Sequence, residues 1–131
     1  MAKRDKRILG KLELMIMQVV WNKNEATVHQ VRNAIQHKRD LAYSTILTMM
    51  RKLEHKGLLA HRTEKRTYIY RPLVGRDEVE RSMLQDLLQT VFSGSYRQFV
   101  NAFVEHENIS KKDLIQLVHE AEDRNRKTDT G

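Results

Sequence analysis

Residues 41–57, LAYSTILTMMRKLEHKG, predict a helix with two unlike faces. Apolar side chains recur at spacings of three and four residues and therefore share one side: Ile46, Leu47, Met49, Met50 and Leu53. The other side carries hydroxyls and cations: Ser44, Thr45, Thr48, Arg51 and Lys52. Small hydroxyls can meet base edges and cations can pair with phosphates, so this face suits the major groove of DNA. On this segment alone, the alternative is an ordinary amphipathic helix with a solvated polar face.

The residues before this helix follow the order of a helix-turn-helix motif. Residues 10–22 keep a helical spacing of apolar side chains, and we expect Trp21 to be buried near the end of that helix. Thr27 with Gln30 is a capping-box pattern that predicts a short second helix over residues 28–36. The polar residues 37–40 then predict a turn, in which Asp40 is expected to cap the helix of residues 41–57. Two helices, a brief turn and a longer helix define the motif.

A β-hairpin is predicted directly after this helix. Gly57 stands where a left-handed C-cap is expected, and two β-prone runs, 58–63 and 67–72, then flank a charged tip. The tip lacks the Asn-Gly or Gly-Gly pair of the tightest turns, so we expect a loop longer than two residues. A hairpin that follows a recognition helix is the wing of a winged helix. Its cations either solvate an exposed hairpin or contact phosphate, and the preceding helix-turn-helix favours phosphate.

These elements together predict the DNA-contacting residues. The base side of the helix is expected to consist of Tyr43, Ser44, Thr45 and Thr48. Phosphates are expected to meet Arg39, Arg51, Lys52, Arg62, Lys65 and Arg66.

The charge of the chain is divided unevenly along its 131 residues. Residues 1–76 hold seventeen Lys and Arg against six Asp and Glu, a net charge of +11, whereas residues 77–131 hold seven against eleven, a net charge of −4. A basic first part predicts contact with a polyanion, and the acidic remainder predicts another role. The chain has no cysteine, no signal-peptide pattern and no apolar run long enough to cross a membrane, so we expect a cytoplasmic protein.

Three amphipathic helices are predicted after the hairpin, over residues 76–92, 96–104 and from 110 to about 123, with Ser110 as a cap and a frayed end beyond. Outside a complete winged helix they bury little unless they meet a partner, and a second copy of the chain is the simplest one. Folding back onto the first domain is the alternative. We therefore expect a mostly α-helical protein with a small β-hairpin: a winged helix-turn-helix domain in residues 1–76 and a helical dimerisation domain in residues 77–131. The expected dimer contacts are Leu84, Leu87, Leu88, Val91, Phe99, Phe103, Leu114 and Leu117.

The chain resembles the BlaI/MecI/CopY family of bacterial repressors, the penicillinase-repressor group. The matching residues run through nearly the whole length: Gly10–Glu13 with Ile16, Met17 and Trp21; Thr27-Val28 with Val31; Leu41–Thr45 with Thr48, Leu53, Lys56 and Gly57; Tyr70–Val74 with Arg76 and Glu78; and Phe92–Ser95. The resemblance implies a homodimer that binds a palindromic DNA operator and represses transcription. It also implies release by a membrane-bound sensor metallopeptidase that cuts the C-terminal domain.

Two departures from the family pattern bear on that mechanism. The bond that corresponds to the cleavage site lies at Ala102–Phe103, where the familiar site has Asn before Phe, so cleavage or the protease preference is in question. The copper-responsive branch carries a cysteine-rich tail, which this chain lacks.

No constellation of residues predicts an enzyme. There is no phosphate-binding glycine loop, no Gly-x-Ser-x-Gly elbow and no His-Glu-x-x-His pair, so we expect neither a catalytic site nor a small-molecule substrate. Glu105-His106-Glu107 is the nearest approach to a metal cluster, but consecutive residues on a helix diverge, so we expect no metal and no cofactor. Two other function classes stay open: a winged helix that binds protein or RNA, and a DNA-binding sensor released by an effector or a metal.

Overall fold

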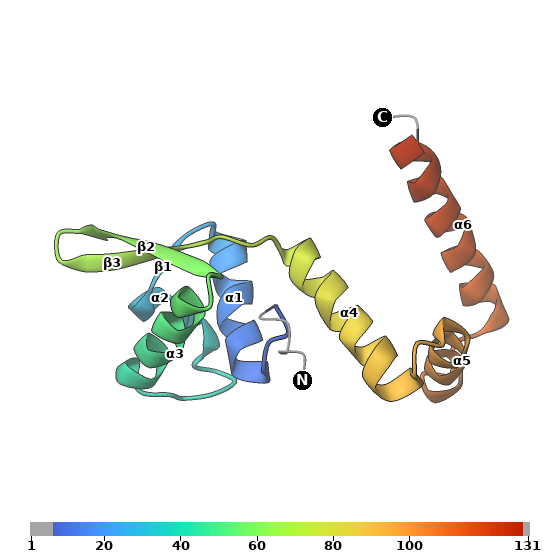
Figure 1. The fold of residues 1–131 in the computed structure, drawn as a ribbon, viewed down its shortest axis with the longest axis horizontal. Helices are drawn as coiled ribbons and strands as arrows, with labels where there is room; N and C mark the ends of the chain where they lie inside the picture. Colours follow the sequence, from blue (N-terminus) through green and yellow to red (C-terminus); the bar gives the residue numbers. More distant parts are fainter. Residues whose placement is uncertain (1–6, 130–131) are drawn as a thin grey trace. The chain divides into compact units, whose positions relative to one another are not determined.

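The computed structural model describes residues 7–129, which form two compact units, one ending at Asp86 and the other beginning at Leu87. The elements run α1 Lys11–Lys23, β1 Ala26–Thr27, α2 Val28–Ile35, α3 Tyr43–His55, β2 Leu59–Glu64, β3 Thr67–Pro72, α4 Arg76–Phe92, α5 Tyr96–His106 and α6 Lys111–Asp129 (Figure 1). Mostly helical structure with a small antiparallel sheet confirms the predicted fold class. None of the helices in the described residues is long and apolar enough to span a membrane.

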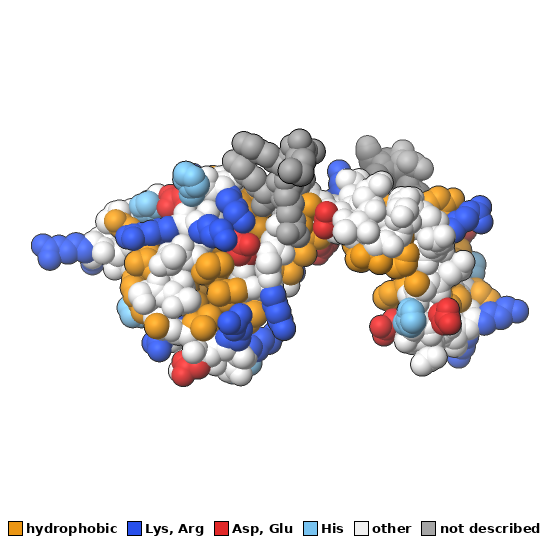
Figure 2. Space-filling view, turned by 60° about the horizontal axis from the view of Figure 1, so that its bottom comes forward, with side chains coloured by type: hydrophobic (Ala, Val, Ile, Leu, Met, Phe, Trp, Pro, Cys, Tyr) orange, Lys and Arg blue, Asp and Glu red, His pale blue; other side chains and the backbone are white. Residues whose placement is uncertain are grey.

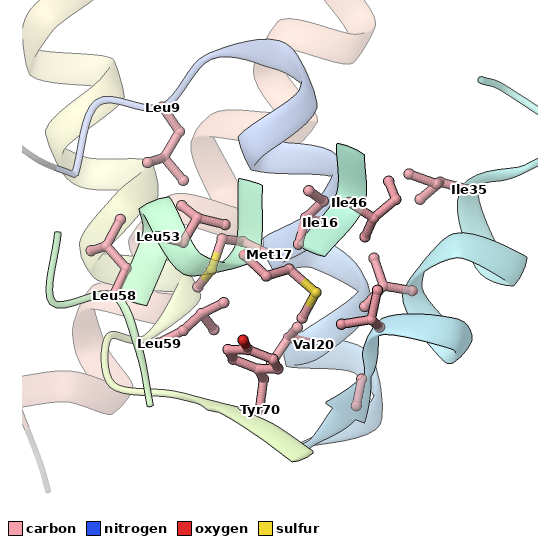
Figure 3. Packing of buried hydrophobic residues seen from close by; sticks show 14 of the residues in the cluster. Leu9, Ile16, Met17, Val20, Ile35, Ile46, Leu53, Leu58, Leu59 and Tyr70 are labelled. Carbon is pink, nitrogen blue, oxygen red and sulfur yellow. The ribbon is translucent and has the colours of Figure 1, made fainter. Parts of the chain in front are cut away.

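The first unit packs α1, α2 and α3 against a three-stranded sheet of order β1-β3-β2. Its core lies between the helices and the inner face of the sheet (Figure 3). The residues in it that are fully buried include Ile16, Met17, Val20, Val31, Ile46, Met50, Leu53, Leu59, Tyr70 and Val79. The apolar side of α3 predicted from the sequence is therefore confirmed, because Ile46, Met50 and Leu53 are buried. Trp21 is only partly buried, and its Nε1 donates a hydrogen bond to the Val74 carbonyl at 2.9 Å.

Local signals placed the ends of α2 and α3 with one exception. The capping box is confirmed, since Thr27 Oγ1 accepts from the Gln30 amide and the Gln30 side chain accepts from the Thr27 amide. The prediction of Asp40 as the cap of α3 is wrong: α3 begins at Tyr43 and its N-cap is Ala42. Arg32 of α2 accounts for the difference, because its guanidinium donates to the Leu41 carbonyl at 2.8 Å and lies 4.0 Å from Asp40.

The end of α3 is a left-handed glycine cap, as predicted. Gly57 has φ +84°, its amide donates to the Glu54 carbonyl, and the Leu58 amide donates to the Leu53 carbonyl. This pair of bonds is the Schellman arrangement, in which the two flanking leucines also pack together in the core. The chain therefore turns from α3 directly into β2.

The predicted hairpin is present, but its tip is tighter than expected. Glu64 pairs with Thr67, so the turn has only two central residues, Lys65 and Arg66, with φ of 48° and 67°. Two successive left-handed residues characterise the turn whose twist matches that of paired strands. The register of the ladder thus imposes this turn on residues that do not favour it. Two residues before α2 add a third strand that the sequence pattern did not reveal, with Ala26 opposite Tyr70 and Thr27 opposite Ile69.

The second unit contains the end of α4, then α5 and α6. Ser95 caps α5 and Ser110 caps α6 through hydrogen bonds to the amides of Gln98 and Asp113, as the sequence predicts for Ser110. The helix of Ser110 continues to Asp129 rather than fraying from residue 124. Val79 of α4 is fully buried in the core of the first unit. The structural division therefore falls inside α4, later than the domain boundary expected after Arg76.

Candidate nucleic-acid interface

The polar side of α3 is open to solvent along its length. Ser44, Thr45, Thr48, Arg51 and Lys52 are all exposed, because the opposite side of the helix is held in the core. The structure therefore brings together the residues predicted for both the bases and the phosphates on α3. Arg39, also exposed, lies in the turn before the helix.

Tyr43 stands at the first turn of α3 against the start of α2. Its ring centroid lies 4.6 Å from that of His29, and its side chain is 40% exposed. Tyr43, predicted for the base side, therefore lies at the start of the exposed face of α3 and remains accessible beside His29.

The Thr48 hydroxyl has a defined hydrogen-bonding state. Thr48 Oγ1 donates to the Ser44 carbonyl one turn earlier at 2.8 Å. A hydroxyl has one proton and two lone pairs, so this oxygen presents only acceptor capacity to the outside. Among base edges in the major groove, the amino groups of adenine and cytosine are the donors that match it.

A hollow of about 450 Å³ separates α3 from the wing. It is lined by Thr27, Val28, His29, Tyr43, Leu47, Arg51, Arg66, Thr67 and Tyr68. The two arginines face it from α3 and from the wing tip, while aromatic rings form other parts of the wall. A hollow with an arginine on two sides suits a sugar-phosphate strand.

The wing tip carries two cations at the most distal point of the hairpin. Lys65 and Arg66 are both exposed, and blue side chains project there in the space-filling view, where Figure 1 places the tip of β2 and β3 (Figure 2). Left-handed conformations at non-glycine residues are strained, and such strain concentrates at functional positions. The tip therefore displays charge in a backbone conformation that costs free energy.

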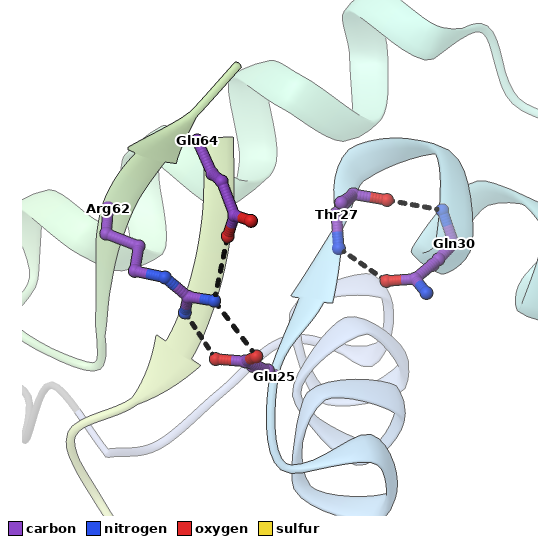
Figure 4. A network of polar contacts seen from close by, with 5 residues as sticks. All are labelled: Glu25, Thr27, Gln30, Arg62 and Glu64. Carbon is purple, nitrogen blue, oxygen red and sulfur yellow. Dashed lines mark hydrogen bonds and ion pairs between the residues drawn. The ribbon is translucent and has the colours of Figure 1, made fainter. Parts of the chain in front are cut away.

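Arg62 differs from the other predicted phosphate contacts because it already has two acidic partners. Its guanidinium forms a bidentate pair with Glu25 and also reaches Glu64 at 3.4 Å (Figure 4). The hydrogen bond from Arg62, only partly opposed by desolvation, lowers the pKa of the Glu25 carboxyl. The same bond with Glu25 raises the pKa of Arg62.

The inner side of the wing is joined to α3 by a second polar contact. His61 Nδ1 lies 2.7 and 2.8 Å from the two oxygens of Glu54, and the histidine ring lies 4.4 Å from that of Tyr68. Because a carboxylate only accepts hydrogen bonds, the histidine nitrogen is the donor. This contact fixes the wing relative to the recognition helix.

The C-terminal turn of α3 is held by an ion pair to α1. Lys56 Nζ lies 2.8 Å from Glu13 Oε2, and Glu13 Oε1 accepts a hydrogen bond from the Gly10 amide at 3.1 Å. Burial raises the pKa of Glu13, but the bonds from Lys56 and Gly10, together with the charges of Lys56 and Lys52, lower it below its ordinary value. Glu13 is therefore ionised in the neutral range. It links Gly10, before α1, to Lys56, after α3.

Three residues of this region were not predicted as parts of the site: His29, Tyr68 and Glu25. The alternation of the hairpin placed Tyr68 on the same face as the buried Tyr70, so a signal for Tyr68 was present in the sequence. His29 comes two residues after Thr27, the predicted cap of α2. That places it in the first turn of α2 but does not show that it lies beside Tyr43. Nothing local links Glu25 to Arg62, since 37 residues separate them.

The C-terminal helices expose the residues predicted for dimerisation. Leu84 is 57% exposed, Leu87 40%, Val91 61%, Phe103 52% and Leu117 46%, while Leu88, Phe99 and Leu114 are half-buried. Figure 2 shows hydrophobic side chains gathered on the surface of the second unit. A hollow of about 270 Å³, lined mostly by apolar groups, includes Phe99, Ala102 and Phe103. Within residues 7–129 no group of His, Asp and Glu is arranged to hold a metal ion.

A recognition-type helix, a helix packed before it and a hairpin behind it define a winged-helix protein. The sequence pattern of the penicillinase repressor family matches residues 9–123. A transcriptional regulator called BlaI from Mycobacterium tuberculosis (strain ATCC 25618 / H37Rv) is 36% identical over 110 residues, which are 82% of this chain and 80% of the relative. The chain belongs to the penicillinase repressor family.

Two further comparisons agree with this assignment. The penicillinase repressor of Bacillus licheniformis is 25% identical over 120 residues, covering 91% of this chain and 94% of that protein. The solution structure of the DNA-binding domain of the repressor BlaI superimposes with a TM-score of 0.51 at 25% identity, and covers 58% of this chain and 93% of that one. The resemblance inferred from sequence motifs is confirmed.

Proposed function

We propose that this protein is a transcriptional repressor that binds double-stranded operator DNA through its winged helix. The observation that carries the proposal is the exposed face of α3, where hydroxyls adjoin cations beside a hollow that contains Arg51 and Arg66. Family membership supports it, because the related proteins are called transcriptional regulators and repressors. The protein works in the cytoplasm, where bacterial DNA is reached directly.

In the proposed complex, α3 lies in the major groove and the wing follows the adjacent backbone. Ser44, Thr45 and Thr48 read base edges, with Tyr43 at the margin, and Thr48 accepts from an adenine or cytosine amino group. Phosphates meet Arg51, Lys52, Lys65, Arg66 and, from the turn, Arg39. Each neutralised phosphate releases counterions, so affinity falls with salt at a log–log slope of about −0.9 per contact.

The division of work between bases and phosphates is testable with Thr48→Val and Arg66→Gln. Valine keeps the shape of threonine and removes the acceptor, so we expect operator binding to weaken by about 1–3 kcal/mol while random DNA is bound as before. Arg66→Gln should weaken binding to both DNAs and reduce the salt slope by about 0.9. Fluorescence anisotropy over a salt series measures both. Equal losses on operator and random DNA for Thr48→Val would exclude the base contact.

The exposed apolar side chains of the second unit support a homodimer on a palindromic operator. Two linked winged helices bind paired half-sites far more tightly than one, because the second contact forms at high effective concentration. Leu87, Val91, Phe103 and Leu117 supply the exposed apolar surface of the second unit, and Leu84, on the part of α4 that belongs to the first unit, is exposed as well. Leu88, Phe99 and Leu114, which are half-buried, complete the contact in this proposal.

Derepression follows when the dimer is loosened. We extend the proposal to cleavage of Ala102–Phe103 by a membrane-bound sensor peptidase, which the family resemblance implies. That bond lies inside α5, next to Phe103 of the proposed dimer contact, so its cleavage would remove part of that contact. Incubation with the peptidase, followed by mass spectrometry, tests the step. An intact chain under conditions that cut a relative with Asn before Phe would exclude cleavage here.

The alternative functions receive less support from the described residues. A module that binds RNA or protein would leave the hydroxyl-and-cation face of α3 without a role. A metal-released sensor would need a ligand cluster, and residues 7–129 contain none. Binding of the purified protein to duplex DNA in preference to RNA of the same length would separate these classes.

A further inference from the structure

The wing receives little support from the apolar core. Every residue from His61 to Tyr68 is exposed, and the hairpin joins the rest of the sheet through only two residues of β1. Hydrophobic packing therefore fixes the base of the hairpin at Leu59 and Tyr70, but not its outer part. The direction in which the tip points must depend on polar contacts.

Two polar contacts hold the hairpin, one on each face of the sheet. Residues directly opposite each other on neighbouring strands share a face, so His61 lies on the inner face with Tyr70, and Arg62 lies on the outer face with Ile69 and Thr27. The inner contact joins His61 to Glu54 of α3. The outer contact joins Arg62 to Glu25 across the central strand β3 (Figure 4).

The surroundings of Arg62 on the outer face are poorly suited to hold a phosphate. One guanidinium there meets two carboxylates, Glu25 and Glu64, so the three side chains together carry a net negative charge. The hollow beside α3 is lined by Arg66, Thr67 and Tyr68 of the wing and does not include Arg62. A phosphate at Arg62 would have to displace a bidentate carboxylate and approach a second one.

We infer that Arg62 is a positioning residue, which Glu25 holds across the outer face of the sheet so that the wing tip is directed at the DNA backbone. The inference rests on the proposed function and replaces the phosphate contact predicted for Arg62. It assigns Glu25, which lies in the loop before β1, to the same task. Lys65 and Arg66 then make the contacts that Arg62 aligns.

The test compares Arg62→Gln, Glu25→Gln and the double variant in the full chain. A positioning pair predicts that both single variants weaken operator binding alike, by about two- to fivefold as for an exposed ion pair, and that the double variant loses no more. The salt slope should stay at the wild-type value in all three. The exchanged pair Arg62→Glu with Glu25→Arg should recover most of the affinity.

Arg71→Gln is the matched control, since Arg71 is exposed on the same outer face and forms no ion pair among the described residues. A phosphate contact at Arg62 would give the opposite pattern: a slope reduced by about 0.9 for Arg62→Gln, and unchanged or tighter binding for Glu25→Gln. That result would overturn the inference.

A second measurement does not depend on DNA. Amide hydrogen exchange in the free protein should become faster in residues 60–71 for Glu25→Gln and Arg62→Gln alike, and not for Arg71→Gln. Unchanged exchange in both variants would overturn the inference even if the protein binds its operator. Faster exchange in a protein that binds no duplex DNA would instead leave the tether in place and remove the proposed function.

Discussion

Glu13 is an acidic residue in the core of a basic unit, and its pairing makes the stability of the fold depend on pH. Because its folded pKa lies below the ordinary value, ionised Glu13 stabilises the folded state above about pH 4.5, and this contribution is lost as the pH falls through the folded pKa. Glu13→Gln should reduce the free energy of unfolding at pH 7 by about 1.5–3 kcal/mol, the range for a hydrogen bond to a charged group. Urea unfolding at pH 7 and at a pH below the folded pKa of Glu13 measures this.

The difference between wild type and Glu13→Gln should shrink at the lower pH, since the wild-type carboxyl is then protonated too. Glu107→Gln, at the exposed residue that follows α5, serves as the control. A destabilisation of the same size at both values of pH would mean that shape, not charge, matters at position 13.

Tyr70 differs from Glu13, because its buried polar group has no hydrogen bond that would stabilise the fold. Its side chain is fully buried and its hydroxyl has no hydrogen-bond partner among the described residues (Figure 3). Burial, helped by the nearby charge of Glu54, raises the pKa of this hydroxyl, so it stays neutral. Tyr70→Phe removes the desolvated oxygen and should leave the free energy of unfolding unchanged or raise it by up to about 1 kcal/mol. A loss above about 1 kcal/mol in thermal unfolding would mean that this oxygen forms a stabilising hydrogen bond in the folded protein.

At the scale of elements, the wing tip combines unfavourable conformation with exposed charge. Left-handed backbone costs L-residues about 1–2 kcal/mol each, whereas Asn-Gly favours a turn of this type. Lys65→Asn with Arg66→Gly should therefore raise the free energy of unfolding by about 1 kcal/mol and weaken DNA binding, with a salt slope reduced by about 0.9 for each lost contact. Calorimetry and anisotropy measure the two effects.

The single variant Lys65→Asn separates the effect of backbone conformation from that of charge. It places a residue that tolerates the left-handed conformation at position 65 and keeps the cation of Arg66. If neither variant stabilises the hairpin, the left-handed conformation at residues 65 and 66 costs little in this turn. If both stabilise it without weakening DNA binding, the tip does not touch the backbone.

Elements were predictable from sequence where their signals are local. The hydroxyl and amide of Thr27 and Gln30 meet within one turn, and Gly57 adopts a backbone conformation that other residues disfavour, so both marked their helix ends correctly. The prediction of Asp40 as a cap is wrong because Arg32, on another helix, binds the same segment. The two-residue turn was missed because the pairing of β2 with β3, not the residues at the tip, determines it.

The candidate site likewise has parts that local sequence signals predict and parts that they do not. The two faces of α3 follow from spacing alone, and the exposed positions there agree with the prediction. The hollow beside α3 and the partners of Arg62 depend on contacts between residues far apart in the chain, for which the sequence carries no periodic signal. Net charge located the basic part of the chain but could not show which cations are already paired.

In the whole molecule, the division inside α4 predicts that residues 1–76 alone lack part of the core of the first unit. Such a chain lacks Val79, which is fully buried in the core of the first unit. Loss of a buried aliphatic side chain costs several kcal/mol in comparable cases, so residues 1–76 should unfold at a lower temperature than residues 1–86. Circular dichroism melting of the two chains makes the comparison, and equal melting temperatures would contradict the role of Val79.

The proposed dimer gives the last prediction, which is best made in the full chain. Phe103 lies on the exposed apolar side of α5, whereas Asn101 is two residues away and therefore near the opposite side of the helix. Phe103→Glu should convert a sedimenting dimer into a monomer, because it places a charge in a buried apolar contact. Binding to a two-site operator should then fall to that of a single half-site, while half-site affinity stays unchanged. Asn101→Glu adds the same charge to the same helix and should remain dimeric; monomers in both variants, or dimers in both, would exclude this face as the contact between copies.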